Sequence, residues 1–251
     1  MRQNKRNILV TRPLTARQLE YARILGLEAI VEPALHFEFP KYWDEVLKVI
    51  NQNTKSDWIF TSTNGVKALE ELMNAGLQVR PEVQLFAVGS KTQKALKKLG
   101  LESKIPQIQD GRHLAELIIK EGKINSVIYF HGNLSRDEMT SRLVEEGIEV
   151  VGLEVYKTVI KPVTMPGKPI SGILFYSPSA VEGFKQGQGF SGELPMLFAI
   201  GPTTAEALRK ETDHSVEVAI QPDTEVLLRT VADYIFKNAE NTERSPSKGD
   251  L

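Results

Sequence analysis

Residues 58–66 read Trp-Ile-Phe-Thr-Ser-Thr-Asn-Gly-Val, and residues 173–181 repeat the pattern as Ile-Leu-Phe-Tyr-Ser-Pro-Ser-Ala-Val. A second pair repeats in the same way, with Leu-Phe-Ala-Val-Gly-Ser-Lys-Thr at 85–92 and Leu-Phe-Ala-Ile-Gly-Pro-Thr-Thr at 197–204. Each segment is a short apolar run followed by small or hydroxyl residues and then by a helix-forming stretch. This order is typical of a buried parallel strand that leads into a helix through a tight turn. The repeats therefore predict two similar α/β domains.

Larger repeated blocks surround these segments. Residues 7–32 carry the pattern strand, helix, strand, and residues 126–153 carry it again. Residues 57–122 and 172–238 are longer blocks in which strands and helices alternate. One short and one long block together make a five-stranded sheet. We therefore expect two similar doubly wound parallel-sheet domains.

Two ways of pairing the blocks are open. Sequential pairing gives the domains 1–122 and 123–251. Nested pairing joins residues 1–35 with 160–240 in one discontinuous domain and leaves residues 40–155 as an inserted domain. The connectors favour the nested pairing.

The two connectors, residues 33–42 and 154–163, both look extended and are bounded by prolines. Lying side by side, they would form a two-stranded hinge between the domains. Residues 183–192 hold four glycines among ten residues and are expected to form a flexible loop. Residues 238–251 lack apolar anchors and are expected to form a disordered tail.

Composition excludes several classes of protein. The chain has 251 residues, of which 41% are hydrophobic, and its 31 basic residues nearly balance its 32 acidic ones. No field of one sign recommends a nucleic acid or a membrane surface as partner. There is no cysteine, no apolar run near the ~20 residues of a membrane helix, and no signal sequence, so we expect a cytoplasmic protein.

The turns that follow the repeated strands suit anions. A helix N-terminus exposes unpaired backbone N–H groups and a partial positive charge, and both favour carboxylates or phosphates. Thr61–Gly65, Gly89–Thr92, Ser177–Ala180 and Gly201–Thr204 each place small or hydroxyl residues at such a point. The alternative is that these residues are ordinary helix N-caps. The same pattern of small and hydroxyl residues recurs in both repeats. This recurrence favours one polyanionic ligand that is bound by both domains.

Other chemistries lack their motifs. The chain has no Walker A sequence, no Gly-x-Gly-x-x-Gly after a strand and no Gly-x-Ser-x-Gly elbow. Its histidines, His36, His113, His131 and His214, are scattered without metal-ligand spacing, so no metal site is expected. Only His131, at a strand end, is a candidate for the cleft.

Tyr156 is the candidate acid, because it lies in the second connector, where a hinge strand would face the ligand. A phenol is protonated at neutral pH and donates a hydrogen bond to a leaving hydroxyl. The alternative is a tyrosine that only packs its ring at the domain junction. Arg12 follows the first strand and is a candidate for pairing with a carboxylate. Lys91 and Arg136 are weaker candidates, for which a surface role is preferred.

Several segments, in this order along residues 7 to 237, resemble the uroporphyrinogen-III synthase family. They are Phe60-Thr61-Ser62, Asn64-Gly65-Val66, Val88-Gly89 with Thr92, Gly132-Asn133-Leu134-Ser135-Arg136, Val155-Tyr156-Lys157-Thr158, Tyr176-Ser177-Pro178-Ser179 and residues 199–205, Ala-Ile-Gly-Pro-Thr-Thr-Ala. The Tyr-Lys-Thr connector and the Gly-Pro-Thr-Thr-Ala segment are the most telling. The resemblance implies two α/β domains on a two-stranded hinge.

The resemblance also implies an enzyme of porphyrin, tetrapyrrole and heme biosynthesis. It would be a cyclising hydro-lyase, free of cofactors, that converts the linear tetrapyrrole hydroxymethylbilane to uroporphyrinogen III with loss of water and inversion of ring D. It would act as a monomer on this small-molecule substrate, handed over transiently by the preceding deaminase. Tyr156 matches the family's connector tyrosine and would assist departure of the hydroxyl. The expected substrate-binding residues are Arg12, Thr61, Ser62, Gly89, Thr92, Gly132, Asn133, Ser177, Ser179, Gly201, Thr203 and Thr204.

Two other classes fit a two-lobed α/β chain. One is a binding protein for a small polyanionic ligand, and the other is a glycosyltransferase that uses a nucleotide sugar. The binding protein would need export, and the glycosyltransferase would need charged contacts to its nucleotide and a longer chain.

Overall fold

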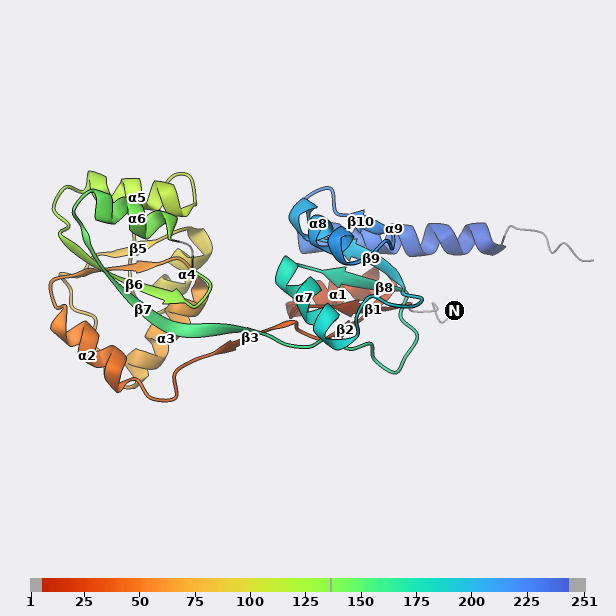
Figure 1. The fold of residues 1–251 in the computed structure, drawn as a ribbon, viewed down its shortest axis with the longest axis horizontal. Helices are drawn as coiled ribbons and strands as arrows, with labels where there is room; N and C mark the ends of the chain where they lie inside the picture. Colours follow the sequence, from red (N-terminus) through yellow and green to blue (C-terminus); the bar gives the residue numbers. More distant parts are fainter. Residues whose placement is uncertain (1–5, 136, 244–251) are drawn as a thin grey trace, which may run out of the picture. The chain divides into compact units, whose positions relative to one another are not determined.

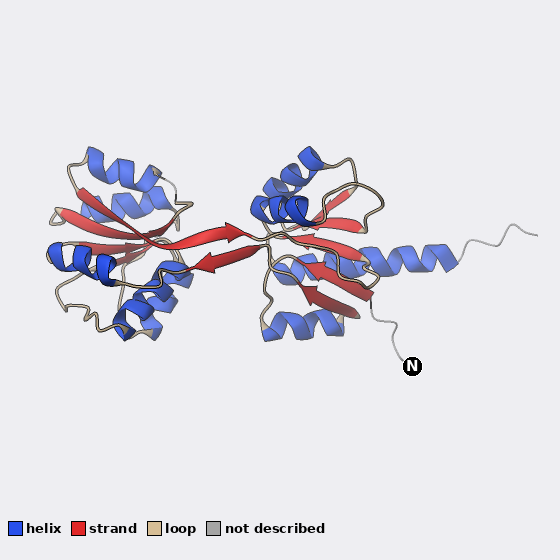
Figure 2. Cartoon of the chain, turned by 60° about the horizontal axis from the view of Figure 1, so that its bottom comes forward, coloured by secondary structure: helices blue, strands red, loops and turns tan. Residues whose placement is uncertain are grey.

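The computed structural model describes residues 6–135 and 137–243 (Figure 1). By its internal contacts the chain divides into two compact units. The terminal unit comprises Met1–His36 and Val159–Leu251, and the central unit comprises Phe37–Thr158. In each unit a sheet carries helices on both faces (Figure 2).

The sheet of the terminal unit is parallel, with the strand order β10-β9-β8-β1-β2. Its strands are β1 (Arg6–Val10), β2 (Leu27–Val31), β8 (Gly172–Phe175), β9 (Met196–Ala199) and β10 (Val216–Val218). Strands from both ends of the chain thus share one sheet, and Val10 on β1 pairs with Val31 on one side and Leu174 on the other. The apolar repeat at 173–175 is the centre of this sheet, and Ile173, Leu174 and Phe175 are fully buried.

Four helices cover this sheet. They are α1 (Ala16–Ile24), α7 (Pro178–Gly187), α8 (Pro202–Glu211) and α9 (Thr224–Glu243). Helices α1 and α9 pack over one face, where their apolar residues join a core with those of β1 and β8. Helices α7 and α8 pack over the opposite face. Parallel strands are therefore buried on both sides, as their continuous apolar sequences require.

The sheet of the central unit has the order β3-β7-β6-β4-β5. Its strands are β3 (Leu35–Glu38), β4 (Asp57–Phe60), β5 (Leu85–Ala87), β6 (Ser126–Gly132) and β7 (Glu149–Ile160). Helices α2 (Asp44–Gln52), α3 (Thr63–Asn74) and α4 (Ser90–Lys98) contribute to the core on one face. Helices α5 (Gly111–Lys120) and α6 (Glu138–Glu145) contribute to the core on the other.

The two sheets repeat one arrangement. In the terminal unit β8 lies between β9 and β1, and in the central unit β4 lies between β5 and β6. A single parallel bridge between Lys104 and Phe86 holds the place beside β5 that β10 holds beside β9. The sequence-based prediction of α/β structure with parallel sheets is confirmed.

The structure corrects the prediction of a flexible loop at 183–192 over residues 183–187, because α7 continues to Gly187, whereas residues 188–192 form neither helix nor strand. The glycines serve close packing instead of flexibility: a Cβ at Gly187 would lie 2.2 Å from the carbonyl oxygen of Val163, and one at Gly183 would lie 2.7 Å from that of Lys161. The backbone of Val163 bonds the Gly183 carbonyl and the Gln188 N–H. A helix rich in glycine is thus held against a neighbouring extended segment.

Two further differences concern helices. The sequence analysis assigned no helix to α2, although Val46, Leu47 and Ile50 have helical spacing. Helix α9 runs to Glu243, so the backbone of residues 238–243 is helical where a disordered tail was expected, because a formed helix propagates at little further cost. The rest of that expected tail, residues 244–251, lies outside the described residues, as does the candidate Arg136.

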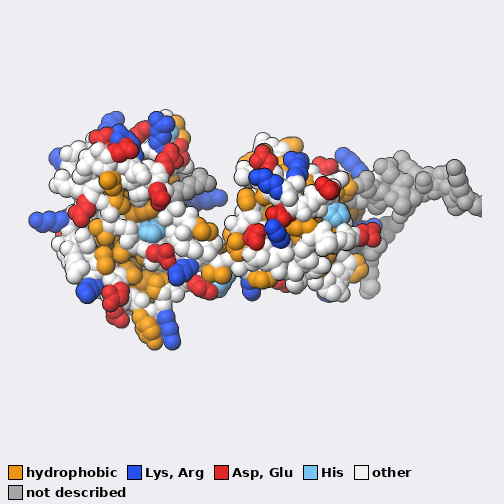
Figure 3. Space-filling view, viewed as in Figure 1, with side chains coloured by type: hydrophobic (Ala, Val, Ile, Leu, Met, Phe, Trp, Pro, Cys, Tyr) orange, Lys and Arg blue, Asp and Glu red, His pale blue; other side chains and the backbone are white. Residues whose placement is uncertain are grey.

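The surface matches the balanced composition, since acidic and basic side chains are interspersed on the face drawn in Figure 3. Among the described helices, none is long and apolar enough to traverse a bilayer.

Candidate functional site

A cavity of about 480 Å³ opens at the carboxyl ends of β4 and β6 in the central unit. We call it the Tyr156 cavity. It is lined by Thr61, Ser62, Val88, Asp110, Gly111, Tyr129, Gly132, Leu134, Ser135, Glu138, Met139, Tyr156 and Thr158. Ligands of doubly wound sheets bind outside the carboxyl ends of the strands, so the cavity lies where this fold places a ligand.

Tyr156 is held in the cavity wall by its neighbours on the adjacent strands. It is half-buried on β7, opposite Gly132 of β6, next to an irregularity in the strand register at His131 and Gly132. A Cβ at Gly132 would lie 2.4 Å from the Tyr156 ring, so only glycine leaves room for the ring there. Phe37 contacts the same ring edge-on with centroids 6.1 Å apart, and Phe39 contacts it at 6.3 Å. Packing against these neighbours therefore holds the Tyr156 ring in place.

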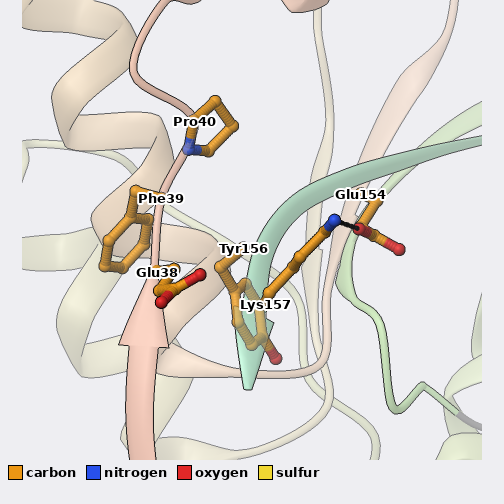
Figure 4. Close-up of a pocket in the computed structure, with 6 residues that line it drawn as sticks. All are labelled: Glu38, Phe39, Pro40, Glu154, Tyr156 and Lys157. Carbon is orange, nitrogen blue, oxygen red and sulfur yellow. Dashed lines mark ion pairs between the residues drawn. The ribbon is translucent and has the colours of Figure 1, made fainter. Parts of the chain in front are cut away.

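A second cavity, of about 330 Å³, also borders Tyr156 (Figure 4). Glu38, Phe39 and Pro40 line one side of it, and Glu154 and Lys157 come from β7 together with the tyrosine. Lys157 and Glu154 form an ion pair at 4.0 Å.

Tyr129 is a functional candidate that the sequence analysis missed. It lies on β6 with only 4% of its surface exposed, and its hydroxyl is 2.9 Å from the Thr61 hydroxyl. Burial raises the pKa of Tyr129, against the lowering effect of hydrogen bonds with Thr61 and Ser135. The phenol is therefore neutral near pH 7. Its only signal in the sequence was a hydroxyl within the apolar run at 126–130.

Ser62 is the N-cap of α3, where its side chain accepts a hydrogen bond from the Asn64 N–H at 3.1 Å. Ser177 is the N-cap of α7 in the same way, accepting from the Ala180 N–H at 3.2 Å. Both serines thus do the work of ordinary helix caps. Ser62 also lines the Tyr156 cavity.

The α4 N-terminus, expected to bind an anion, is occupied by a side chain of the protein. Gln109 Oε1 accepts a hydrogen bond from the Ser90 N–H at 2.9 Å, and a Cβ at Gly89 would lie 2.5 Å from that oxygen. Thr92 is buried, with 4% of its surface exposed. Neither Gly89 nor Thr92 is among the described residues that line the Tyr156 cavity.

Asn133 pairs with the backbone of β7. Its Oδ1 accepts from the Thr158 N–H at 2.8 Å, and its Nδ2 donates to the Thr158 carbonyl at 3.3 Å. The Asn133 N–H donates to the Tyr156 carbonyl at 3.3 Å. This residue therefore fixes the strand that carries Tyr156 and Thr158, and its side-chain amide is already used.

The remaining candidates belong to the terminal unit. Thr204 is 3% exposed, Thr203 is exposed at the start of α8, and Ser179 is half-buried in the first turn of α7. Gly201 is the N-cap of α8, and a Cβ there would meet its nearest heavy atom, Pro222 Cβ, only at 3.9 Å. An alanine Cβ at this position would therefore fit without a clash.

Arg12 is engaged by two side chains of its own unit. Its guanidinium lies over the Tyr176 ring at 4.2 Å from the centroid, and Nη2 donates to the Thr224 hydroxyl. Within the described part of the chain, Arg12 Nε and the Tyr176 hydroxyl are buried without a hydrogen-bond partner. Burial raises the pKa of Tyr176 to about 12, against the lowering effect of Arg12. This corner is packed with side chains.

The structure thus brings four predicted residues together around one cavity, which are Thr61, Ser62, Gly132 and Tyr156. Thr158, Ser135, Asp110 and Glu138 join them and were not predicted. Asp110 caps α5 through the His113 N–H, and that hydrogen bond is the largest cause that holds its carboxyl pKa below the usual value. Across residues 6–135 and 137–243, no three His, Asp or Glu side chains converge as a metal site would require.

Comparison with known proteins supplies independent information. Residues 17–229 match the family model described as uroporphyrinogen-III synthase HemD. The porphyrin biosynthesis protein HemD of Ruminiclostridium josui is 32% identical over 224 residues, which cover 81% of this chain and 44% of that protein. The chain therefore spans less than half the length of this curated relative.

Two solved structures resemble the fold. Uroporphyrinogen-III synthetase from Helicobacter pylori gives a TM-score of 0.64 at 19% identity, over 92% of this chain and 99% of that chain. A mutant uroporphyrinogen III synthase from the extremely thermophilic bacterium Thermus thermophilus gives a TM-score of 0.57 at 18% identity, over 94% of this chain and 99% of that chain.

Proposed function

Because this chain belongs to the uroporphyrinogen-III synthase family, we propose that it converts hydroxymethylbilane to uroporphyrinogen III with loss of water and inversion of ring D. The observation that carries the proposal is the match to the family over residues 17–229. The Tyr156 cavity supports it, because its hydroxyl groups suit a substrate that carries a leaving hydroxyl and carboxylate arms. The relatives are named for synthesis, which gives no support to the alternative of a polyanion-binding protein.

Tyr156 is the proposed acid. Its phenol donates a hydrogen bond to the hydroxyl oxygen as the C–O bond breaks, and the pyrrole nitrogen supplies the electron pair that forms the azafulvene. The ring-D carbon that already carries a substituent attacks this electrophile, and a spiro intermediate then rearranges to the inverted macrocycle. One water leaves and no net oxidation occurs, so the balanced reaction needs no cofactor.

Holding the chain folded for attack is the main task of the protein, since the electrophile forms readily once the hydroxyl leaves. In the central unit, Thr61, Ser62 and Gly132 border the space beside Tyr156. Gly89 and Thr92 are proposed to bind substrate after Gln109 has left the N-terminus of α4. Asn133 is proposed to position β7. The residues proposed to bind carboxylate arms from the terminal unit are Arg12, Ser177, Ser179, Gly201, Thr203 and Thr204.

The domain arrangement proposed with this function is nested. Residues 1–35 and 160–240 form one domain, residues 40–155 form the other, and the connectors form a two-stranded hinge. Support comes from the contact-based division, whose limits fall within β3 and β7, and from the adjacent positions of these strands in one sheet. We further propose a monomer that receives its substrate from the preceding deaminase.

Isomer analysis tests the reaction. Hydroxymethylbilane is generated from porphobilinogen and its deaminase with and without this protein, the products are oxidised, and uroporphyrins I and III are separated by chromatography. Dominant III isomer that depends on this protein is the expected result. Formation of the I isomer alone, from a sample whose circular dichroism shows a folded protein, would overturn the proposal.

A further inference from the structure

We propose that Glu138 is a second catalytic residue of the Tyr156 cavity, where its carboxylate accepts the pyrrole N–H of the ring that loses its hydroxyl. Glu138 and Tyr156 both line this cavity, the first from α6 and the second from β7. The inference rests on the proposed function for the identity of the ligand. It adds a proton acceptor for the pyrrole nitrogen to the proton donor already proposed for the departing oxygen.

Glu138 is the first residue of α6 and lies beside the start of α5. Asp110 is the N-cap of α5, and Gly111 is its first residue. A Cβ at Gly111 would lie 3.5 Å from the Met139 Cβ, so the two helices begin side by side. Both helices pack on the same face of the sheet (Figure 1). The Asp110 and Glu138 side chains therefore belong to one side of the cavity.

This side of the cavity is acidic. Among the described residues that line the cavity, the charged ones are Asp110 and Glu138. Asp110 accepts a hydrogen bond from the His113 N–H at 2.8 Å, and Glu138 is the acidic residue in the first turn of α6. The protein's own carboxylates thus already complement the positive ends of both helices, which leaves little attraction for a substrate carboxylate.

Neutral hydroxyls belong to a different part of the cavity wall. Ser62 is the N-cap of α3, and Thr61 precedes it. Helix α3 packs on the sheet face opposite to that of α5 and α6. Carboxylate arms of the substrate are therefore expected near α3, and a part of the substrate without negative charge is expected near α5 and α6.

The nitrogen edge of a pyrrole is such a part. The carboxylate arms are attached to the two ring carbons farthest from nitrogen, and the N–H donates a strong hydrogen bond to a charged acceptor. Glu138 is available for this bond and Asp110 is not. The two Asp110 oxygens lie 2.7 and 2.9 Å from His113 Nδ1, whereas the described part of the chain offers Glu138 no hydrogen bond or ion pair.

The proton balance of the step is as follows from these positions. The nitrogen electron pair forms the new C=N bond as the C–O bond breaks, and the N–H proton passes to Glu138. The hydroxyl leaves as water with the proton of Tyr156. The Glu138 proton returns to nitrogen when the new C–C bond makes the ring aromatic again, and the proton that ring D loses on closure restores Tyr156.

Steady-state kinetics with hydroxymethylbilane test the role of Glu138. Glu138→Gln keeps the shape and one acceptor oxygen but removes the negative charge. We expect kcat for III-isomer formation to fall about thirtyfold with KM within about twofold of wild type, since positive charge on the nitrogen develops only in the transition state. An unchanged kcat, in a variant whose urea unfolding shows a folded protein, would overturn the proposal.

Asp137→Asn is the matched control, because it removes a negative charge one residue away. Asp137 makes no side-chain cap hydrogen bond at the start of α6 and is not among the described residues that line the cavity. Its kcat should stay within about twofold of wild type, since it has no contact with the reacting ring. A fall in kcat as large as that of Glu138→Gln would show a general effect of charge and overturn the proposal.

Chemical rescue supplies a readout that a structural role would not give. Glu138→Ala leaves space that a small carboxylate can enter, so formate should raise its kcat, whereas chloride at the same ionic strength should not. Formate should not raise the kcat of Tyr156→Phe, which lacks a proton donor. Failure of formate to raise the kcat of Glu138→Ala would overturn the proposal.

The wild-type protein separates this inference from the proposed function. Dominant III isomer from the wild type, together with an unaffected Glu138→Gln variant, would overturn the role of Glu138 alone. The I isomer alone from folded wild-type protein would overturn the proposed function and this inference with it.

Discussion

The two units place different chemistry at equivalent corners of their two similar sheets. The repeated segments align Thr61 with Tyr176, and the strand register pairs Phe60 with Phe130 in one unit and Val10 with Leu174 in the other. The corner of the central unit is a cavity with paired neutral hydroxyls, whereas that of the terminal unit is filled by a guanidinium stacked on a phenol. Duplication has thus kept the backbone turn and changed the side chains, which leaves the central corner open to a ligand.

The largest expected effect is a loss of kcat in the central unit, where we place the reaction. Tyr156→Phe should lower kcat by about a hundredfold, because a positioned acid contributes at least that factor. Ser177→Ala in the terminal unit should lower kcat less than about tenfold and cost about 1 kcal/mol of stability, since its hydroxyl caps α7. Rates of III-isomer formation and urea unfolding measure both. Equal losses of kcat in two folded variants would remove the special role of Tyr156.

Two glycines at the ends of strands give the next comparison. Gly132→Ala forces the Tyr156 ring to move, because the new Cβ would lie 2.4 Å from it, and we expect kcat/KM to fall about thirtyfold, or about 2 kcal/mol. Gly201→Ala places its Cβ at an ordinary contact distance of 3.9 Å from Pro222 Cβ and keeps the backbone amide, so a loss below about threefold is expected. A similar loss of kcat/KM in both variants would show that the position of the Tyr156 ring against Gly132 does not affect the reaction.

Alkaline pH should act through the terminal corner. The Tyr176 pKa is raised to about 12 from 10.0, so between these values the unfolded chain has lost a proton that the folded chain still holds. Stability therefore falls as pH rises through this window, by up to about 1.4 kcal/mol per pH unit from this group. Urea unfolding of Tyr176→Phe at about pH 9 and about pH 11 should show a smaller decline than that of the wild type. Identical declines in the unfolding free energy of the two proteins would show that Tyr176 does not cause this pH dependence.

The smallest effect compares the two phenol hydroxyls at neutral pH. Tyr129→Phe removes a hydroxyl that bonds Thr61 and should lower the unfolding free energy by about 1 kcal/mol. Tyr176→Phe removes a buried hydroxyl that has no hydrogen-bond partner among the described residues, so a change within about 0.5 kcal/mol is expected. The reverse order of losses would contradict this difference between the corners.

The sequence predicted the elements wherever a single segment carries its own signal. The apolar runs at 58–60 and 173–175 predicted strands correctly, because a parallel sheet that is covered on both faces needs apolar residues at successive positions. The prediction at Gly183 and Gly187 was wrong because flexibility and close packing both favour a residue without a Cβ. Only the nearby backbone of Lys161 and Val163 shows that close packing applies here. Helix α2 was missed because it begins at Asp44, directly after an extended connector that masks its start.

The candidate site was predictable only in part, for a similar reason. Thr61, Ser62 and Tyr156 stand in motifs that point to a strand end or a connector. Tyr129 lies inside an apolar strand, and its meaning depends on the hydroxyl of Thr61, 68 positions away on the neighbouring strand. Contacts between side chains on neighbouring strands depend on the strand register, which cannot be read from a single sequence.

The shared sheet of the terminal unit also has a consequence for the order of folding. Thr11 Oγ1 donates to the Leu174 carbonyl at 2.8 Å across 163 sequence positions, so this strand pair waits for the second half of the chain. Residues 37–158 need neither end, and by folding first they shorten the loop that the pair must close, which lowers its entropic cost. Pulse-labelled hydrogen exchange during refolding should protect β4 and β6 before β1 and β8. On a ribosome, the oldest part of this chain would be among the last to find its neighbours.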